Sequence, residues 1–140
     1  MHLLLPVVIF VVFVGFASAG NPMDSLDDDQ KEMLKMLHDS CVGDSGADEG
    51  LIAKAIKGDF TDDGNLKAYM ACIFQNLGAM DENGVPDMDT MISMLPASMQ
   101  ERGGKMIGSC KGVTGSDAAD TAMKLNQCFY NADPGYYFMF

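Results

Sequence analysis

The sequence predicts an all-α domain, a compact bundle of about six short helices. Three observations lead to this prediction. Apolar residues recur at helical spacing along most of the chain, no long stretch alternates with the period of a β-strand, and segments rich in glycine and aspartate separate the periodic stretches. The chain has 140 residues, which is the size of one domain.

The first two helices are expected over residues 24–40 and 47–56. In the first, Leu34 and Leu37 share a face with other apolar residues, and three aspartates occupy the first turn, where the helix dipole favours negative charge. A loop rich in glycine, aspartate and serine separates the two helices, and Gly58 ends the second.

The third helix is the clearest of the six, because its apolar residues follow the spacing i, i+3, i+4, i+7, i+8, i+11. These residues are Leu66, Tyr69, Met70, Ile73, Phe74 and Leu77. After a turn at residues 81–84, Pro86 suits the first position of a fourth helix, which Pro96 ends. The inward residues of the fourth helix are expected to be Met88, Met91, Ile92 and Leu95.

The fifth helix is expected over residues 97–110, although Gly103 and Gly104 inside it each cost about 1 kcal/mol relative to alanine. Ser116 is the expected N-cap of the sixth helix. The chain then ends in the apolar segment 136–140, which would favour aggregation if its five side chains were exposed. This segment therefore either packs on the helical body or forms a wall of a cavity.

Residues 1–19 are predicted to be a signal peptide. Residues 3–16 form an apolar run that is too short to span a membrane, and residues 17–19 have the small-x-small pattern of a signal-peptidase site. The first residues contain no Lys or Arg, which leaves an uncleaved anchor as an alternative. Residues 20–140 would then be a secreted domain without membrane insertion, in a compartment that permits disulfides.

The charge balance excludes one class of function. The chain has 20 acidic residues against 9 basic ones, which gives a formal net charge of −11. Nucleic-acid binding needs clustered Lys and Arg at the phosphates, so we expect no nucleic-acid partner. The acidic surface instead favours solubility of an otherwise methionine-rich chain.

The four cysteines stand at positions 41, 72, 110 and 128, and spacing alone leaves all three connectivities open. Here the chain resembles the insect odorant-binding proteins, whose usual framework has six cysteines. Cys72 and Cys128 resemble the third and sixth of these, while Ala68 and Ala119 stand where the second and fifth would be. Since the second and fifth are bonded to each other in that family, one whole bridge is missing, as in its four-cysteine "minus-C" subclass.

The resemblance implies two bridges, Cys41–Cys72 and Cys110–Cys128, and none between the third helix and the sixth. We expect this to leave the cavity between those helices more compliant than in six-cysteine relatives. The ending of the sixth helix, Cys128 to Pro134, also resembles the family.

The resemblance further implies a function: a secreted carrier that binds small hydrophobic molecules of the odorant or pheromone type in an internal pocket and moves them through sensillar lymph or another extracellular fluid. Such a carrier is not an enzyme, needs no cofactor or metal, and is a monomer or weak dimer. A membrane odorant receptor is a candidate partner. The alternative is a secreted interaction or structural protein on the same scaffold without a physiological small ligand.

The expected ligand pocket is lined by inward residues of the helices together with the C-terminal segment. From the helices we expect Met70, Ile73, Phe74, Leu77, Met88, Met91, Ile92, Leu95 and Met106. From the C-terminal segment we expect Tyr136, Tyr137 and Phe138, and the two tyrosines are candidates for a hydrogen bond to a ligand oxygen. The same periodicity also fits an ordinary solid core, and spacing does not distinguish the two.

Two other motifs lack residues that the sites they resemble require. The segment His38-Asp39-Ser40-Cys41 is similar to the catalytic helix of secreted phospholipase A2, but no glycine-rich calcium loop precedes it. We expect His38 to be a solvated surface residue. Residues 59–64 begin like an EF-hand loop, yet the twelfth position, which requires a bidentate Glu, is Met70.

Overall fold

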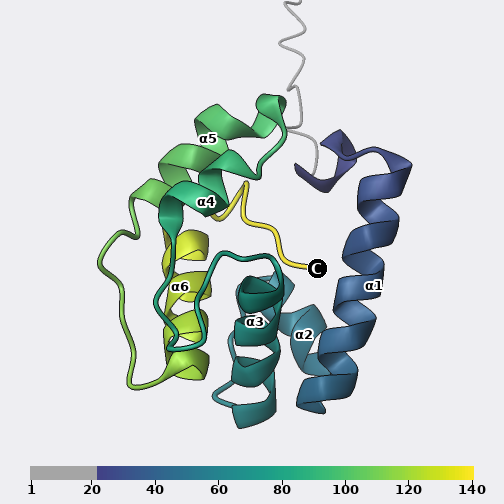
Figure 1. Ribbon diagram of the computed structural model, residues 1–140, viewed down its shortest axis with the longest axis vertical. Helices are drawn as coiled ribbons and strands as arrows, with labels where there is room; N and C mark the ends of the chain where they lie inside the picture. Colours follow the sequence, from purple (N-terminus) through teal and green to yellow (C-terminus); the bar gives the residue numbers. More distant parts are fainter. Residues whose placement is uncertain (1–21) are drawn as a thin grey trace, which may run out of the picture.

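The computed structural model describes residues 22–140, and within this range the regular structure is helical (Figure 1). The elements are η1 (Pro22–Ser25), α1 (Asp28–Ser45), α2 (Glu49–Ile56), α3 (Gly64–Asn76), α4 (Met88–Ser93), α5 (Ala97–Gly108) and α6 (Ala118–Ala132). The described residues contain no β-strand, only an isolated bridge between Met80 and Pro86. The all-α prediction is therefore confirmed. The predicted signal peptide, residues 1–19, lies outside the described residues.

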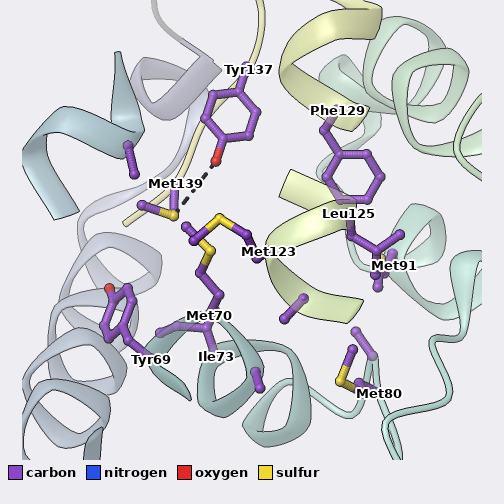
Figure 2. Packing of buried hydrophobic residues seen from close by; sticks show 14 of the residues in the cluster. Tyr69, Met70, Ile73, Met80, Met91, Met123, Leu125, Phe129, Tyr137 and Met139 are labelled. Atoms are coloured by element: carbon purple, nitrogen blue, oxygen red, sulfur yellow. Dashed lines mark hydrogen bonds between the residues drawn. The ribbon is translucent and has the colours of Figure 1, made fainter. Parts of the chain in front are cut away.

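Helices α3 and α6 pack against each other in the middle of the molecule, α1 covers one side of α3, and α4 with α5 form the other side (Figure 1). The apolar faces of these helices meet in one core (Figure 2). Between α3 and α6, Phe74 contacts Phe129 edge to face, with ring centroids 6.4 Å apart. The core includes buried residues of both helices, among them Tyr69, Ile73 and Leu125.

Aspartate begins five of the six α-helices. The N-caps are Asp27, Asp48, Asp63, Asp87 and Asp117, and the side chain of each accepts a hydrogen bond from a backbone N–H in the first turn. A carboxylate at this position satisfies an otherwise unpaired donor and interacts favourably with the helix dipole. Part of the acidic excess therefore serves to define where the helices begin.

The first helix is displaced relative to the sequence-based expectation of residues 24–40. Asp27 and Gln30 form a reciprocal capping box, which places the first turn at Asp28. The helix then continues through Gly43 and ends at Gly46, whose left-handed backbone (φ 68°) lets its N–H bond to the Val42 carbonyl oxygen. A residue with a side chain adopts this backbone conformation only at a cost, so Gly46 determines the end of α1.

Two further helix starts differ from the expectation, the fourth by two residues and the sixth by one. The fourth helix begins after Asp87 and not at Pro86, and the sixth after Asp117 and not after Ser116. In both cases an aspartate is the stronger acceptor for the first-turn N–H groups. The Ser116 N–H instead bonds back to Asp120, and this hydrogen bond together with the ammonium of Lys124 lowers the pKa of the Asp120 carboxyl.

Disulfides join Cys41 to Cys72 and Cys110 to Cys128, which are the pairings that the family resemblance implied. The first ties α1 to α3 and the second ties the segment after α5 to α6. The partners are 31 and 18 positions apart, so each bridge removes denatured-state entropy worth about 3–4 kcal/mol in the chain-entropy model. Among the described residues there is no free cysteine.

Noncovalent contacts join α3 to α6 where the third bridge of six-cysteine relatives would lie. Next to Ala68, the Lys67 ammonium is 2.6 Å from Asp62 Oδ1 and 3.9 Å from Asp120 Oδ1, and Asp120 follows Ala119. The hydrogen bond with Asp62 raises the pKa of Lys67. These charges are exposed enough for solvent to screen them, so apolar packing supplies most of the α3–α6 attachment.

Restoring the missing bridge tests the compliance of this attachment. In the double variant Ala68→Cys/Ala119→Cys, we expect the new disulfide to raise the free energy of unfolding by about 1–3 kcal/mol and to narrow the range of ligand sizes bound. Thiol titration, thermal melting and ligand competition measure the three effects. The single variant Ala68→Cys is the control; a formed bridge that leaves the ligand range unchanged contradicts the compliance hypothesis.

Candidate functional site

The main internal feature is an apolar cavity of about 190 Å³ between α1, α3, the α4–α5 pair, α6 and the C-terminal segment. Nearly all of its lining is aliphatic, aromatic or thioether, and the two polar side chains are those of Gln30 and Asn126. The complete lining is Met23, Leu26, Gln30, Met33, Leu34, Met70, Ile73, Phe74, Leu77, Ala79, Met91, Met94, Leu95, Pro96, Met99, Met106, Ile107, Asn126, Phe129, Phe138, Met139 and Phe140.

One face of α3 provides the floor of the cavity. Met70, Ile73, Phe74 and Leu77 are spaced so that they lie on the same side of the helix, and all four line the cavity. Asp63 caps the start of this helix by accepting from the Leu66 N–H, which sets its first turn. The periodicity of the third helix therefore determines this wall directly.

Close approach of α5 to the end of α4 provides a second wall. A Cβ atom on Gly103 would lie 2.8 Å from Leu95 Cδ1, so only glycine permits this packing without a shift. The approach brings Leu95 and Met106 to the same cavity. Gly103 lowers the intrinsic stability of α5 as a helix, but it allows the close packing that brings Leu95 and Met106 to the cavity.

Eight of the twelve residues expected in the pocket line this cavity. They are Met70, Ile73, Phe74, Leu77, Met91, Leu95, Met106 and Phe138.

Met88, Ile92, Tyr136 and Tyr137 are not among the lining residues. Helix α4 is short and turns only Met91 toward the cavity, so Met88 faces a separate surface hollow and Ile92 packs beside Gly104 of α5. Tyr136 is held elsewhere by its ring, and Tyr137 by its ring and its hydroxyl.

The cavity also contains residues that the sequence reasoning did not assign to it. Five further methionines line the cavity beside three of the four that were expected: Met23, Met33, Met94, Met99 and Met139. Met33 had a signal, because it is one of the apolar residues that share a face with Leu34 and Leu37 in the first helix, but no residue of that helix was expected in the pocket. Methionine is flexible and polarizable, so eight such side chains form a lining that can adapt to ligands of different shape.

The C-terminal segment enters the interior as an extended strap that runs toward α1 (Figure 1). Phe138, Met139 and Phe140 line the cavity, whereas Tyr136 and Tyr137 precede them and hold the segment in place. The segment is thus a wall of the cavity, as the resemblance implied, and its apolar side chains are not left exposed.

The strap is anchored first at its base. Arg102 of α5 donates two hydrogen bonds to Asp133, at 2.7 and 2.9 Å, and its guanidinium carbon lies 4.6 Å from the Tyr136 ring centroid. The hydrogen-bonded guanidinium lowers the pKa of the Asp133 carboxyl below its usual range.

A second anchor holds the middle of the strap. The Tyr137 hydroxyl donates to Asn126 Oδ1 at 2.8 Å and also lies 3.6 Å from the sulfur of Met139 (Figure 2). The ring packs edge to face against Phe60 and Tyr130. Burial raises the pKa of Tyr137, so the hydroxyl keeps its proton.

A third anchor holds the end of the strap. The Tyr69 hydroxyl donates to the backbone oxygen of Phe140 and is hydrogen-bonded to His38 Nδ1 at 2.7 Å. His38 Nε2 lies 2.9 Å from a Glu49 oxygen.

The side chain of His38 is only 20% exposed, so the expectation of a solvated surface histidine is wrong: contacts from α2 and α3 cover it. Burial, followed by the nearby carboxylates of Glu49 and Asp39, raises the pKa of Tyr69.

The mouth of the cavity lies near the start of α1 and the end of α4. Met33 and Met94 both line the cavity and are 59% and 44% exposed, so the cavity reaches the surface beside them. Large exposed apolar side chains at such a place favour entry of an apolar molecule from water.

Among the described residues that line the cavity, none has a titratable side chain. Within residues 22–140 no group of three or more His, Cys, Asp or Glu side chains is arranged to hold a metal ion. Asp63, part of the EF-hand-like segment, instead caps α3. In the same range no helix is long and apolar enough to cross a lipid bilayer. Burial of an apolar molecule is what this lining can do.

Comparison with known proteins agrees with this geometry. The sequence profile of the PBP/GOBP family matches residues 23–132. The chain is 31% identical over 117 residues to the B2 protein of Tenebrio molitor, covering 82% of this chain and 91% of that protein.

Solved structures are similar as well. Odorant binding protein 4 of Chrysopa pallens aligns with a TM-score of 0.73 and 27% identity, over 81% of this chain and 98% of that one. The fatty acid binding protein OBP56a from the oral disk of the blowfly Phormia regina aligns with a TM-score of 0.61 and 26% identity, over 78% and 96%.

Removal of residues 138–140 should open the cavity and leave the fold intact. The truncated chain keeps the contact of Tyr136 with Arg102 and the hydrogen bond from Tyr137 to Asn126. It loses three lining side chains, so we expect the affinity for a fluorescent apolar probe to fall about tenfold or more. Fluorescence titration measures the affinity and circular dichroism the fold. Unchanged affinity with an intact fold would show that the strap is not a wall of the binding site.

The Arg102–Asp133 pair should make the attachment of the strap to α5 depend on pH. Because the pKa of Asp133 is lowered in the folded state, the pair contributes its full stability above the ordinary Asp pKa of about 3.9 and loses it as pH falls through the lowered value. Arg102→Met should therefore lower the melting temperature at pH 6 to 7 and have little effect at about pH 2.

The matched control for this prediction is Lys105→Met, which removes the same charge from an exposed position on the same helix. We expect it to change the melting temperature much less at neutral pH. An effect of Arg102→Met that is independent of pH would mean that the side chain acts by packing on Tyr136 alone.

Proposed function

Because the chain belongs to the PBP/GOBP family, whose odorant-binding members are carriers of small ligands and not enzymes, we propose that its own cargo is a small apolar molecule of the odorant or pheromone type. The observation that carries this proposal is the methionine-rich cavity closed by the C-terminal strap. We further propose that the carrier works outside the cell, in sensillar lymph or a similar fluid, and that its leader is residues 1–19.

The mechanism of carriage is burial. Transfer of apolar ligand surface from water into the cavity is worth about 25 cal/mol per Å², less the cost of ordering the ligand and the lining. The cavity of about 190 Å³ lies below the roughly 300–1,000 Å³ of drug-sized sites. A ligand of about a dozen heavy atoms with affinity on the order of micromolar fits these limits.

Similar proteins support an apolar cargo. The blowfly protein is described as a fatty acid binding protein, and an apolar chain of that kind is compatible with the lining here. The soft methionine side chains can move apart to admit molecules larger than the cavity at rest. The net charge of −11 opposes self-association, which suits a carrier that acts as a monomer or weak dimer.

Displacement of a bound fluorescent probe tests the proposal. Wild-type protein should bind an apolar naphthylamine probe at micromolar concentration, and a panel of odorant-like alcohols, ketones and esters should displace it competitively. The truncation 138–140 is the control for binding in the cavity. Failure of the probe and of the whole panel to bind at tens of micromolar would favour a secreted interaction or structural protein on the same scaffold.

A further inference from the structure

The cavity contains one buried amide that the packing of the fold leaves only partly used. Asn126 on α6 is 5% exposed and lines the cavity. A buried amide in an apolar lining is costly unless its hydrogen-bonding groups are satisfied, so its partners indicate what it can recognise.

The orientation of the amide follows from its two protein partners. Oδ1 accepts from the Tyr137 hydroxyl at 2.8 Å, and Nδ2 donates to the Ala122 carbonyl oxygen at 2.9 Å. The reverse orientation would place Oδ1 against that carbonyl oxygen, which is a contact between two acceptors. The NH₂ group therefore lies on the Ala122 side.

An Asn NH₂ group has two hydrogens, and the Ala122 carbonyl accepts one. No acceptor within residues 22–140 is found for the other, and the remaining neighbours of the amide in the cavity are apolar. A ligand atom that accepts a hydrogen bond would complete the set and remove the cost of the unused donor.

Gln30, the other polar lining residue, is placed differently. Its Oε1 accepts from the Asp27 backbone N–H in the capping box of α1, close to the exposed mouth residue Met33. A donor at the mouth can be satisfied by water. The interior donor is that of Asn126.

We propose that Asn126 Nδ2 donates a hydrogen bond to an acceptor oxygen of the ligand and so selects apolar molecules that carry a carbonyl or similar oxygen at one end. This inference rests on the proposed carrier function and names the class of cargo. Since the mouth lies at Met33 and Met94 and Asn126 is buried, the oxygen-bearing end enters first.

Tyr137 is a positioning residue in this arrangement. The sequence suggested its hydroxyl as a direct ligand contact, but that hydroxyl is engaged by Asn126 Oδ1 and Tyr137 does not line the cavity. By holding Oδ1 it prevents the amide from rotating, so the free N–H keeps one direction. The strap thus links closure of the cavity to orientation of its donor.

The test compares two ligands of similar size, butyrophenone and 2-phenylpentane. In 2-phenylpentane a methyl group and a hydrogen atom replace the carbonyl oxygen. In competition against the fluorescent probe, Asn126→Leu should weaken butyrophenone about three- to tenfold and change 2-phenylpentane less than twofold. Asn131→Leu, the same substitution at an exposed position of α6 that does not line the cavity, is the matched control and should leave both affinities unchanged. Tyr137→Phe should weaken butyrophenone selectively, but less than Asn126→Leu.

A measurement on the wild-type protein keeps the proposal testable if the Leu variant does not fold. With ¹⁵N labelling, the side-chain NH₂ resonances of Asn126 should shift on addition of butyrophenone, one proton more than the other, and much less with 2-phenylpentane. The proposal would be overturned if Asn126→Leu weakened both ligands equally or neither of them. It would also be overturned if the two ligands shifted the Asn126 NH₂ resonances equally.

The outcome also separates this inference from the proposed function. If the probe and both ligands fail to bind the wild-type protein, the carrier function is wrong. If they bind and the preference does not depend on Asn126, the carrier function stands and only the role of Asn126 is wrong.

Discussion

The cavity depends on one constraint: the C-terminal segment must fold back into the helical body. Without it, the apolar faces of α1, α3 and α6 would meet solvent in place of the strap. Three contacts oppose the entropy of freeing the segment: Arg102 at its base, the Tyr137–Asn126 hydrogen bond in its middle and the Tyr69–Phe140 hydrogen bond at its end. The three anchoring residues lie on α5, α6 and α3. The strap can therefore make all three contacts only when these helices are packed in their native arrangement.

Rigid and soft parts of the molecule are separated. The two disulfides join α1 to α3 and the end of α5 to α6, while methionines make up much of the lining between them. Cross-links of this kind restrict the backbone, whereas thioether side chains change rotamer at little cost. The combination preserves the cavity as a whole and lets its surface adjust, while hydrogen bonds hold the buried lining residue Asn126 in place.

Local features were predictable because they depend on neighbouring residues. Helical spacing predicted α3 and its four lining residues, and small errors at the starts of α4 and α6 arose because the stronger aspartate caps, Asp87 and Asp117, were not chosen. The role of Gly103 was not predictable. Glycine weakens a helix, and the reason for it at this position is that Leu95 packs closely against it in the folded protein. His38 was expected at the surface for a similar reason: the residues that cover it, Tyr69 and Glu49, belong to α3 and α2 and are distant from it in sequence.

The sequence by itself determined the helical class, the cysteine framework and the apolar faces, since each is expressed within a few turns of chain or in the spacing of a motif. Only the tertiary structure decided which of those faces enclose the cavity. Four expected residues do not line it: Met88, Ile92, Tyr136 and Tyr137. Met88 and Ile92 are as apolar as the residues that do line it. What separates them is the direction of packing between elements distant in sequence, and periodicity along one helix carries no information about that direction.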